Sequence, residues 1–236
     1  MMFQRLVLLS LAIAWAVLPL RAALSEEVDV QLVLAADGSG SIDDDEFRLQ
    51  RAGYAAAITD ERILNAIRSG FHQAIAIAFV EWGAPESQHT IVDWTVIRDA
   101  ASARDFAERL LAAPRVAWGY NSISNVIDYS ARLIRENGHS SPRKIIDISG
   151  DGPQMNGQPL APIRARAIGE GITINALVVA ADGGRFPGMS GEALLQHYQL
   201  DIIGGPGAFA MTADGRQRFA HAILNKMIRE IAMKTP

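Results

Sequence analysis

The sequence alternates short apolar segments with longer amphipathic ones, and this alternation restricts the fold more than any other feature. Apolar runs bounded by turn residues predict strands, and apolar residues spaced three or four apart predict helices. The expected strands are 28–36, 73–82, 88–97, 143–149, 172–180 and 208–213. The expected helices are 44–58, 61–70, 102–113, 125–137, 161–171 and 215–232, and the segment 191–203 is left unassigned.

Helices that alternate with strands usually connect parallel neighbours within one sheet. We therefore predict a single α/β domain with a doubly wound, mostly parallel six-stranded sheet and helices on both faces. The short connection 83–85 between the second and third strands is typical of a hairpin. One of these two strands should consequently be an antiparallel edge.

The first 22 residues have the layout of a secretory signal peptide. Arg5 precedes an uncharged run over 6–20, and the small residues Ala22 and Ala23 follow. A membrane-spanning helix needs about 20 apolar residues. We therefore expect cleavage near Ala22 and no membrane span in the mature chain, with retention as an N-terminal anchor as the alternative. The predicted location is outside the cytoplasm, in a periplasm or as a secreted protein.

Charge and cysteine content narrow the functional classes. Removal of residues 1–22 leaves 20 basic and 26 acidic side chains, a net charge of −6. No basic surface for nucleic acid is evident, so we expect no nucleic-acid partner. The chain has no cysteine, which excludes a lipid-anchored bacterial lipoprotein and any disulfide framework. Its hydrophobic core must therefore hold the fold unaided.

Three polar loops lie near the ends of the predicted strands. In doubly wound folds ligands bind at the carboxyl ends of the strands, so these loops should converge at one edge of the sheet. Their hydroxyl, amide and carboxylate oxygens suit a hard divalent cation. The loops are Asp-Gly-Ser-Gly-Ser (37–41), Gly-Tyr-Asn-Ser (119–122) and Ser-Gly-Asp-Gly (149–152).

Residues 35–46 also match most of the sequence pattern of an EF-hand calcium loop. In that register Asp37, Asp43 and Glu46 fall at ligand positions. Ala35 then occupies the first position and has no oxygen to offer, and a predicted strand precedes the loop where an EF-hand needs a helix. We therefore prefer a site built from several loops, and we interpret Asp43 and Glu46 as a capping box that begins the next helix.

With these motifs in place, the chain resembles a von Willebrand factor A (vWA) domain over residues 26–234. More narrowly, it resembles a group of exported bacterial proteins of this type. The segments that carry the resemblance are LVLAADGSGSIDDDEFRLQRAGYAAAI (32–58), AFVEWG (78–83) and IIDISGDG (145–152).

The resemblance implies a metal-ion-dependent adhesion site, abbreviated MIDAS. Its ligands would be Asp37, Ser39, Ser41 and Asp151, and its ion Mg²⁺, with Mn²⁺ or Ca²⁺ as alternatives. The family normally adds a threonine hydroxyl from the second loop, but here Asn121 stands at that position. Either the Asn121 amide oxygen or, after a shift of one residue, the hydroxyl of Ser122 would complete the site.

The resemblance also implies the kind of partner. Members of the family bind a ligand whose acidic group completes the metal shell, so we expect a protein or peptide that supplies a carboxylate. The candidate ligand-binding residues are Ser122, Gly152 and Gln154.

Two other functions remain open at this point. One is a structural interaction domain whose metal site has degenerated. The replacement of the expected threonine by Asn121 is the observation that favours it. The other is a metal-dependent hydrolase in which Asp37 or Asp151 positions a metal-bound water. The sequence has no nucleophile elbow and no glycine-rich phosphate loop ending in Lys-Ser, so a non-catalytic binding protein is the leading prediction.

Overall fold

The computed structural model describes residues 26–180, 189–214 and 216–233, so the predicted signal peptide lies outside the described residues. The strands are β1 (Val30–Asp37), β2 (Ile75–Trp82), β3 (Gln88–Ile97), β4 (Lys144–Gly150), β5 (Ile172–Ala180) and β6 (Ala210–Asp214). The helices are α1 (Asp44–Ile58), α2 (Glu61–Arg68), α3 (Ala100–Ala112), α4 (Ile123–Glu136), α5 (Leu160–Gly169), α6 (Gly191–His197) and α7 (Arg216–Ala232).

The six strands form one sheet in the order β3-β2-β1-β4-β5-β6. Every neighbouring pair is parallel except β2 and β3, which are antiparallel and place β3 at an edge. The predicted fold class is therefore confirmed. The chain winds outward from β1 to β3 and then returns to place β4 on the other side of β1. This reversal lies between β1 and β4, which is where doubly wound folds bind ligands.

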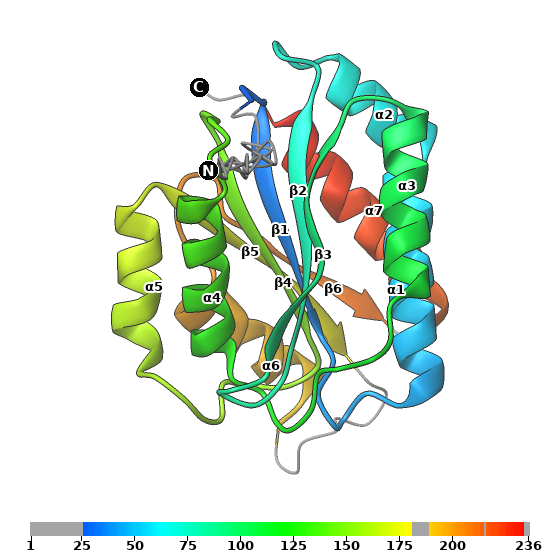
Figure 1. Ribbon diagram of the computed structural model, residues 1–236. Coiled ribbons are helices and arrows are strands. Elements are labelled where there is room, and N and C mark those ends of the chain that lie inside the picture. The colour runs from blue at the N-terminus through cyan, green and yellow to red at the C-terminus, as the bar shows by residue number, and fades with distance from the viewer. Residues whose placement is uncertain (1–25, 181–188, 215, 234–236) are drawn as a thin grey trace, which may run out of the picture.

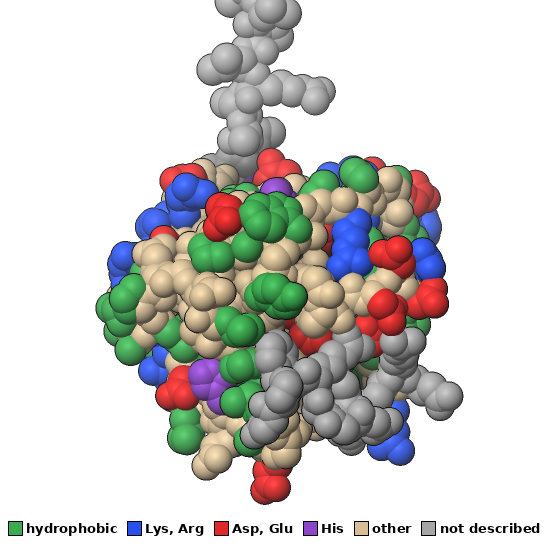
Figure 2. All heavy atoms as spheres, turned by 90° about the horizontal axis from the view of Figure 1, so that it is seen from below, with side chains coloured by type: hydrophobic (Ala, Val, Ile, Leu, Met, Phe, Trp, Pro, Cys, Tyr) green, Lys and Arg blue, Asp and Glu red, His purple; other side chains and the backbone are tan. Residues whose placement is uncertain are grey.

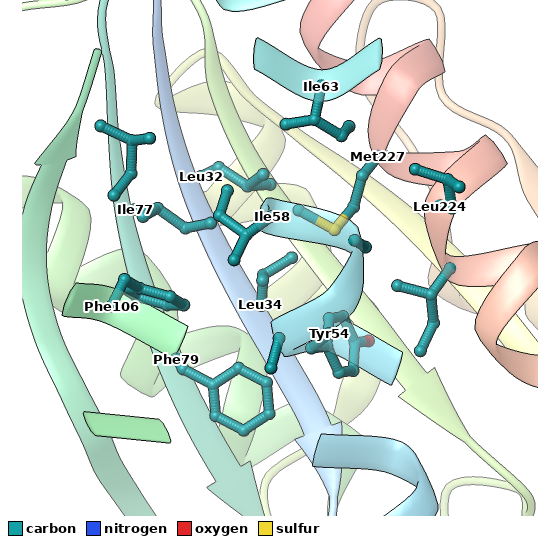
Figure 3. Close-up of a cluster of buried hydrophobic side chains, with 14 of the residues drawn as sticks. Leu32, Leu34, Tyr54, Ile58, Ile63, Ile77, Phe79, Phe106, Leu224 and Met227 are labelled. Carbon is teal, nitrogen blue, oxygen red and sulfur yellow. The ribbon is translucent and has the colours of Figure 1, made fainter. Parts of the chain in front are cut away.

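Helices cover both faces of the sheet, with α1, α2, α3 and α7 on one face and α4, α5 and α6 on the other (Figure 1). Alternate residues of β1 serve the two layers because successive strand residues point to opposite faces. Leu32 and Leu34 belong to the core under α1 and α7, whereas Val33 and Ala35 belong to the core under α4. Figure 3 shows the first core, where Tyr54 of α1 lies among these leucines.

A buried ionic cluster fastens α7 to the sheet. The ammonium group of Lys226 pairs with the carboxylates of Asp147 on β4 and Glu230 on α7. The amide of Asn175 on β5 donates to Glu230 Oε1 at 2.9 Å. All four side chains are at least 98% buried. Buried charges of this kind persist only when they are paired, so the cluster fixes the position of α7 on the sheet.

The segment 191–203 forms two consecutive helical pieces in the structure. α6 ends at His197, and the chain continues as a π-helical turn, η1 (Tyr198–Ile202). The wider turn accompanies a fully buried Tyr198, whose hydroxyl donates to the carbonyl of Gly152 at 3.0 Å. Among the described residues, no helix is both long enough and apolar enough to cross a membrane.

Candidate metal-binding site

The first loop of the site begins at the last residue of β1. Asp37 is fully buried, and its Oδ1 accepts a hydrogen bond from the Ser39 backbone N–H at 2.8 Å. The hydroxyls of Ser39 and Ser41 lie 2.9 Å apart. Ser41 in turn donates to Oδ1 of Asp151 at 2.9 Å. These contacts join the oxygen groups of the first and third loops, as the sequence predicts.

The third loop is packed tightly beneath Asp151. A Cβ atom on Gly150 would lie 2.6 Å from the Tyr198 hydroxyl and 3.2 Å from the ring of Trp82, so only glycine fits there without displacement. Burial raises the pKa of the Tyr198 hydroxyl, and the charges of Asp37 and Asp151 raise it further. The same hydroxyl donates to the carbonyl of Gly152, so Tyr198 also fastens the third loop.

The second loop crosses between the other two. The carbonyl of Gly119 accepts from the backbone N–H of Gly40 at 2.8 Å, and the carbonyl of Asn121 accepts from the backbone N–H of Met155 at 2.9 Å. Gly119 has φ +82°, and a Cβ atom there would lie 2.5 Å from Cβ of Ala84. Glycine is thus required where the loop passes the β2–β3 turn. The backbone places Asn121 between the two acidic loops.

Asn121 and Ser122 differ in what their side chains bind. Asn121 is fully buried, and neither its amide oxygen nor its amide nitrogen has a hydrogen-bond partner. The hydroxyl of Ser122 lies 2.8 Å from the Asn156 carbonyl and 3.0 Å from Oδ1 of Asn125, so it already anchors the start of α4. Of the two residues proposed to complete the site, Asn121 is the one with unsatisfied polar atoms.

Oδ2 of Asp37 is a further buried oxygen without a hydrogen-bond partner. Each unpaired buried polar group costs about 1–3 kcal/mol of stability, so such groups are rare in native structures. Of these unpaired atoms, Oδ2 of Asp37 and the amide oxygen of Asn121 are the ones that a bound cation would satisfy. The residues present therefore fit the metal that the sequence resemblance implies.

The pKa of Asp37 also supports a bound cation. Burial raises the pKa of Asp37 to about 7, and the negative charge of Asp151 adds to the rise. Two carboxylates in this environment repel each other when both are ionised. A cation bound between them would remove this penalty. The described residues contain no group of three or more His, Cys, Asp or Glu arranged to hold a metal, so any such site relies on neutral oxygens as well as on these two acids.

The remaining predicted contact residues are Gln154, Gly152 and Ser122. The Gln154 side chain accepts from the backbone N–H of Ser124 at 2.8 Å and donates to the Ser124 hydroxyl at 3.1 Å and to the Asn156 carbonyl at 2.6 Å. These bonds attach the third loop to α4. Gly152 is buried and directs its carbonyl to Tyr198. Direct ligand contact by Gln154, Gly152 or Ser122 stays a prediction.

The acidic stretch after the first loop begins a helix. Asp43 accepts from the backbone N–H of Glu46 at 2.8 Å, and Glu46 accepts from the backbone N–H of Asp43 at 3.1 Å. This is the capping box that the sequence predicts. β1 runs directly into the loop from the other side, so the helix that an EF-hand would need there is absent from this described segment.

Sequence reasoning missed one feature of the site. Arg115 contacts the first loop from the connection between α3 and α4, and nothing in the local sequence marks this role. The site also has a rim of exposed apolar side chains on the second and third loops. Trp118, Tyr120 and Met155 are 52%, 59% and 48% exposed. Figure 2 views the molecule from this end, where hydrophobic side chains are visible on the surface.

Residues 27–235 match the family described as "Protein of unknown function (DUF1194)". The chain belongs to this family. No curated protein matches the sequence at a significant level.

Solved structures with the same fold are vWA domains and proteins that contain them. The pilus adhesin SpaC from Lactobacillus rhamnosus GG aligns with a TM-score of 0.62 at 16% identity, over 87% of this chain and 30% of SpaC. The vWF domain of the pili tip protein Mfa5 from Porphyromonas gingivalis aligns with a TM-score of 0.59 at 11% identity, over 89% of this chain and 98% of that domain.

Proximal thread matrix protein 1 from the mussel byssus, in a structure with a zinc-occupied MIDAS motif, aligns with a TM-score of 0.61 at 14% identity. The alignment covers 88% of this chain and 49% of the mussel protein. At these identities the likeness shows the fold alone. This member of the DUF1194 family has the fold of a vWA domain.

Proposed function

We propose that this vWA domain is an exported, non-catalytic binding protein that engages a protein or peptide ligand through a divalent cation. Asp37, Ser39, Ser41, Asn121 and Asp151 would hold the ion, with Mg²⁺ as the expected metal and Mn²⁺ or Ca²⁺ as alternatives. The observation that carries the proposal is the convergence of three loops at the topological switch point, with unpaired buried oxygens on Asp37 and Asn121.

A carboxylate is the ligand group that suits such an ion. Mg²⁺ prefers small oxygen donors in near-octahedral geometry and retains several positions for water or substrate. The proposed set has few carboxylates, so an acidic side chain or chain terminus of a partner would be well placed to complete the shell. The ion would supply the electrostatic attraction, and the residues of the three loops would orient it.

The rim supports a macromolecular partner. Trp118, Tyr120 and Met155 are exposed on the loops that carry Asn121 and Asp151. Aromatic residues and methionine are enriched at protein interfaces, and exposed large apolar side chains gathered around a polar centre often mark binding surfaces. The adhesin and pilus-tip structures that share the fold also fit an extracytoplasmic binding role.

Metal binding is the first test. Titration of Mg²⁺ and Mn²⁺ into the mature protein is expected to raise its melting temperature, because a ligand that binds only the folded state stabilises it. The double variant Asp37→Ala, Ser41→Ala should lose this rise. Asp45→Asn is the matched control, because Asp45 lies in the following helix, is exposed and pairs with the exposed Arg48. No metal-dependent shift in the wild type would contradict the metal site and favour a degenerate interaction domain.

Partner binding is the second test. Capture from the native envelope, with and without a chelator, should yield a partner that is lost both with chelator and with Asp37→Ala. Esterification of the carboxylates of that partner should also abolish capture. A partner list unaffected by either change would contradict metal-mediated binding. Turnover of ester or phosphate substrates that depends on Asp151 would instead support a metal-dependent hydrolase.

A further inference from the structure

We propose that Arg115 is a positioning residue for this metal site: it holds the first loop in the conformation that a small cation requires. The inference rests on the proposed function and assigns a role to a residue outside the predicted ligand set. Its basis is the set of contacts that Arg115 makes with the loop 38–42. This loop carries both proposed serine ligands, Ser39 and Ser41.

The guanidinium group of Arg115 binds three backbone carbonyls of this loop. Its Nη2 atom lies 3.2 Å from the carbonyl oxygen of Gly38, 3.0 Å from that of Ser39 and 2.8 Å from that of Ile42. Its Nη1 atom donates to Asp44 at 3.0 Å, at the start of α1. One side chain thus ties together the loop on which Ser39 and Ser41 are placed.

A second arginine fixes the segment from which Arg115 extends. Arg51 of α1 is buried, and its guanidinium group donates to the carbonyls of Leu110, Ala113 and Pro114. Its charge is balanced by Glu81 of β2, 2.7 Å away and fully buried.

The ring of Phe47 contacts both arginines. The guanidinium carbon of Arg51 is 4.5 Å from the ring centroid and that of Arg115 is 4.9 Å. Cation–π contacts of this kind fix the orientation of a guanidinium group as well as its position. Arg115 is therefore held by the ring of Phe47 as well as by the loop before any ion binds.

Because Arg115 is positively charged, the direction of the change in cation affinity on its removal tests the proposal. A positive side chain close to a cation site repels the ion, so on electrostatic grounds alone its removal should strengthen cation binding. If Arg115 instead positions the loop, its removal should weaken binding, because the serine oxygens would no longer be held in place. The two explanations predict opposite changes in affinity.

The experiment compares Arg115→Gln and Arg115→Lys with the wild type, and uses Arg48→Gln as the control. Arg48 is an exposed arginine of α1 whose ion pair is with Asp45. Calorimetric titration with Mg²⁺ should show a loss of affinity of about tenfold or more in Arg115→Gln, by analogy with the cost of removing groups that orient metal ligands. Arg115→Lys should recover part of it, since an ammonium group can reach a carbonyl but lacks the planar fork.

The ratio of Mg²⁺ to Ca²⁺ affinity separates positioning from general destabilisation. Mg²⁺ demands near-ideal octahedral geometry, whereas Ca²⁺ tolerates irregular shells. Arg115→Gln should therefore weaken Mg²⁺ binding more than Ca²⁺ binding. Equal loss for both ions, unchanged affinity or tighter Mg²⁺ binding would each overturn the inference.

Hydrogen exchange in the presence of chelator tests the same role without metal. The Gly40 amide donates to Gly119 at 2.8 Å, and the Ile42 amide donates to Ser39 at 3.1 Å. Both amides should exchange faster in Arg115→Gln while core strands exchange as in the wild type. Unchanged exchange would overturn the inference. If wild-type protein binds no cation, the proposed function fails, and this exchange measurement still decides whether Arg115 orders the loop.

Discussion

Asn121 connects the structure of the site to its proposed use more directly than any other residue. Neither polar atom of its buried amide has a hydrogen-bond partner, so the metal-free protein bears a cost, and a cation bound to the amide oxygen would remove part of it. In Asn121→Ala we expect no loss of stability in chelator, and a gain of up to about 1 kcal/mol, together with weaker Mg²⁺ binding. Thermal unfolding with and without Mg²⁺ measures both effects.

Asn121→Thr is the matching control, because the resemblance to vWA domains implies a threonine hydroxyl at this position. This variant should retain a Mg²⁺-dependent rise in melting temperature. If Asn121→Ala binds Mg²⁺ as tightly as the wild type, Asn121 is not a ligand and the second loop has another role.

Gly150 tests the packing beneath the site. An added methyl group would meet the Tyr198 hydroxyl and the Trp82 ring, so Gly150→Ala should destabilise the protein by about 1–3 kcal/mol through overpacking. Gly169→Ala is the control: its Cβ would meet no atom within 4 Å, and alanine favours the helix. Urea denaturation of both variants measures the difference. Equal stabilities would mean that the loop above Tyr198 yields at little cost.

At the scale of elements, α7 depends on its buried ionic cluster. Lys226→Met would leave Asp147 and Glu230 facing each other without their cation. We expect a loss of about 3–5 kcal/mol in the free energy of unfolding, the usual cost of breaking a buried pair. The exposed pair of Arg48 and Asp45 provides the control, and Arg48→Ala should change stability by less than about 0.5 kcal/mol. A similar small effect for Lys226→Met would show that the cluster adds little to the attachment of α7.

The same cluster makes stability depend on pH. Burial raises the pKa of Glu230 to about 7, and the charge of Asp147 adds to the rise while Lys226 opposes it. An unfolded glutamate titrates near 4.3, so between these values the folded state holds a proton that the unfolded state has lost. This contribution to stability is complete below the unfolded pKa and is lost as the pH rises through about 7.

We therefore expect the free energy of unfolding to decrease from about pH 5 to about pH 7, by up to about 1 kcal/mol per pH unit from this group. Glu230→Gln mimics the protonated form and should reduce the slope over that range, while Asp37, whose pKa burial also raises to about 7, continues to contribute a slope of the same sign. Denaturant unfolding at several pH values provides the measurement. A slope in the variant equal to that of the wild type would assign the pH dependence to other groups.

For the whole molecule, most of the fold could be predicted because it rests on local patterns. The predicted strand 88–97 and helix 44–58 match β3 and α1, and the antiparallel edge follows from the short turn between β2 and β3. Boundaries elsewhere differ by a few residues, since the ends of elements depend on tertiary contacts. The π-helical turn η1 could not be predicted, because it accompanies the burial of Tyr198 under a loop distant in sequence.

The candidate site could likewise be predicted only in part from the sequence. Sequence spacing alone predicted which loops meet, because parallel strands bring their carboxyl ends to one edge of the sheet. It left the choice between Asn121 and Ser122 open, since neighbouring residues on a loop can each point inward. Their different hydrogen bonding appears only when the loop is placed against α4 and the third loop.

The sequence by itself thus determined the order of strands and helices, the polar loops at the carboxyl end of the sheet and the capping box at α1, because each depends on residues close together in the chain. Only the tertiary structure decided the ring of contacts around Arg115, the burial of Asn121 and the ionic cluster beneath α7. These bring together residues far apart in sequence. Their energies come from burial and geometry, which no local pattern of residues encodes.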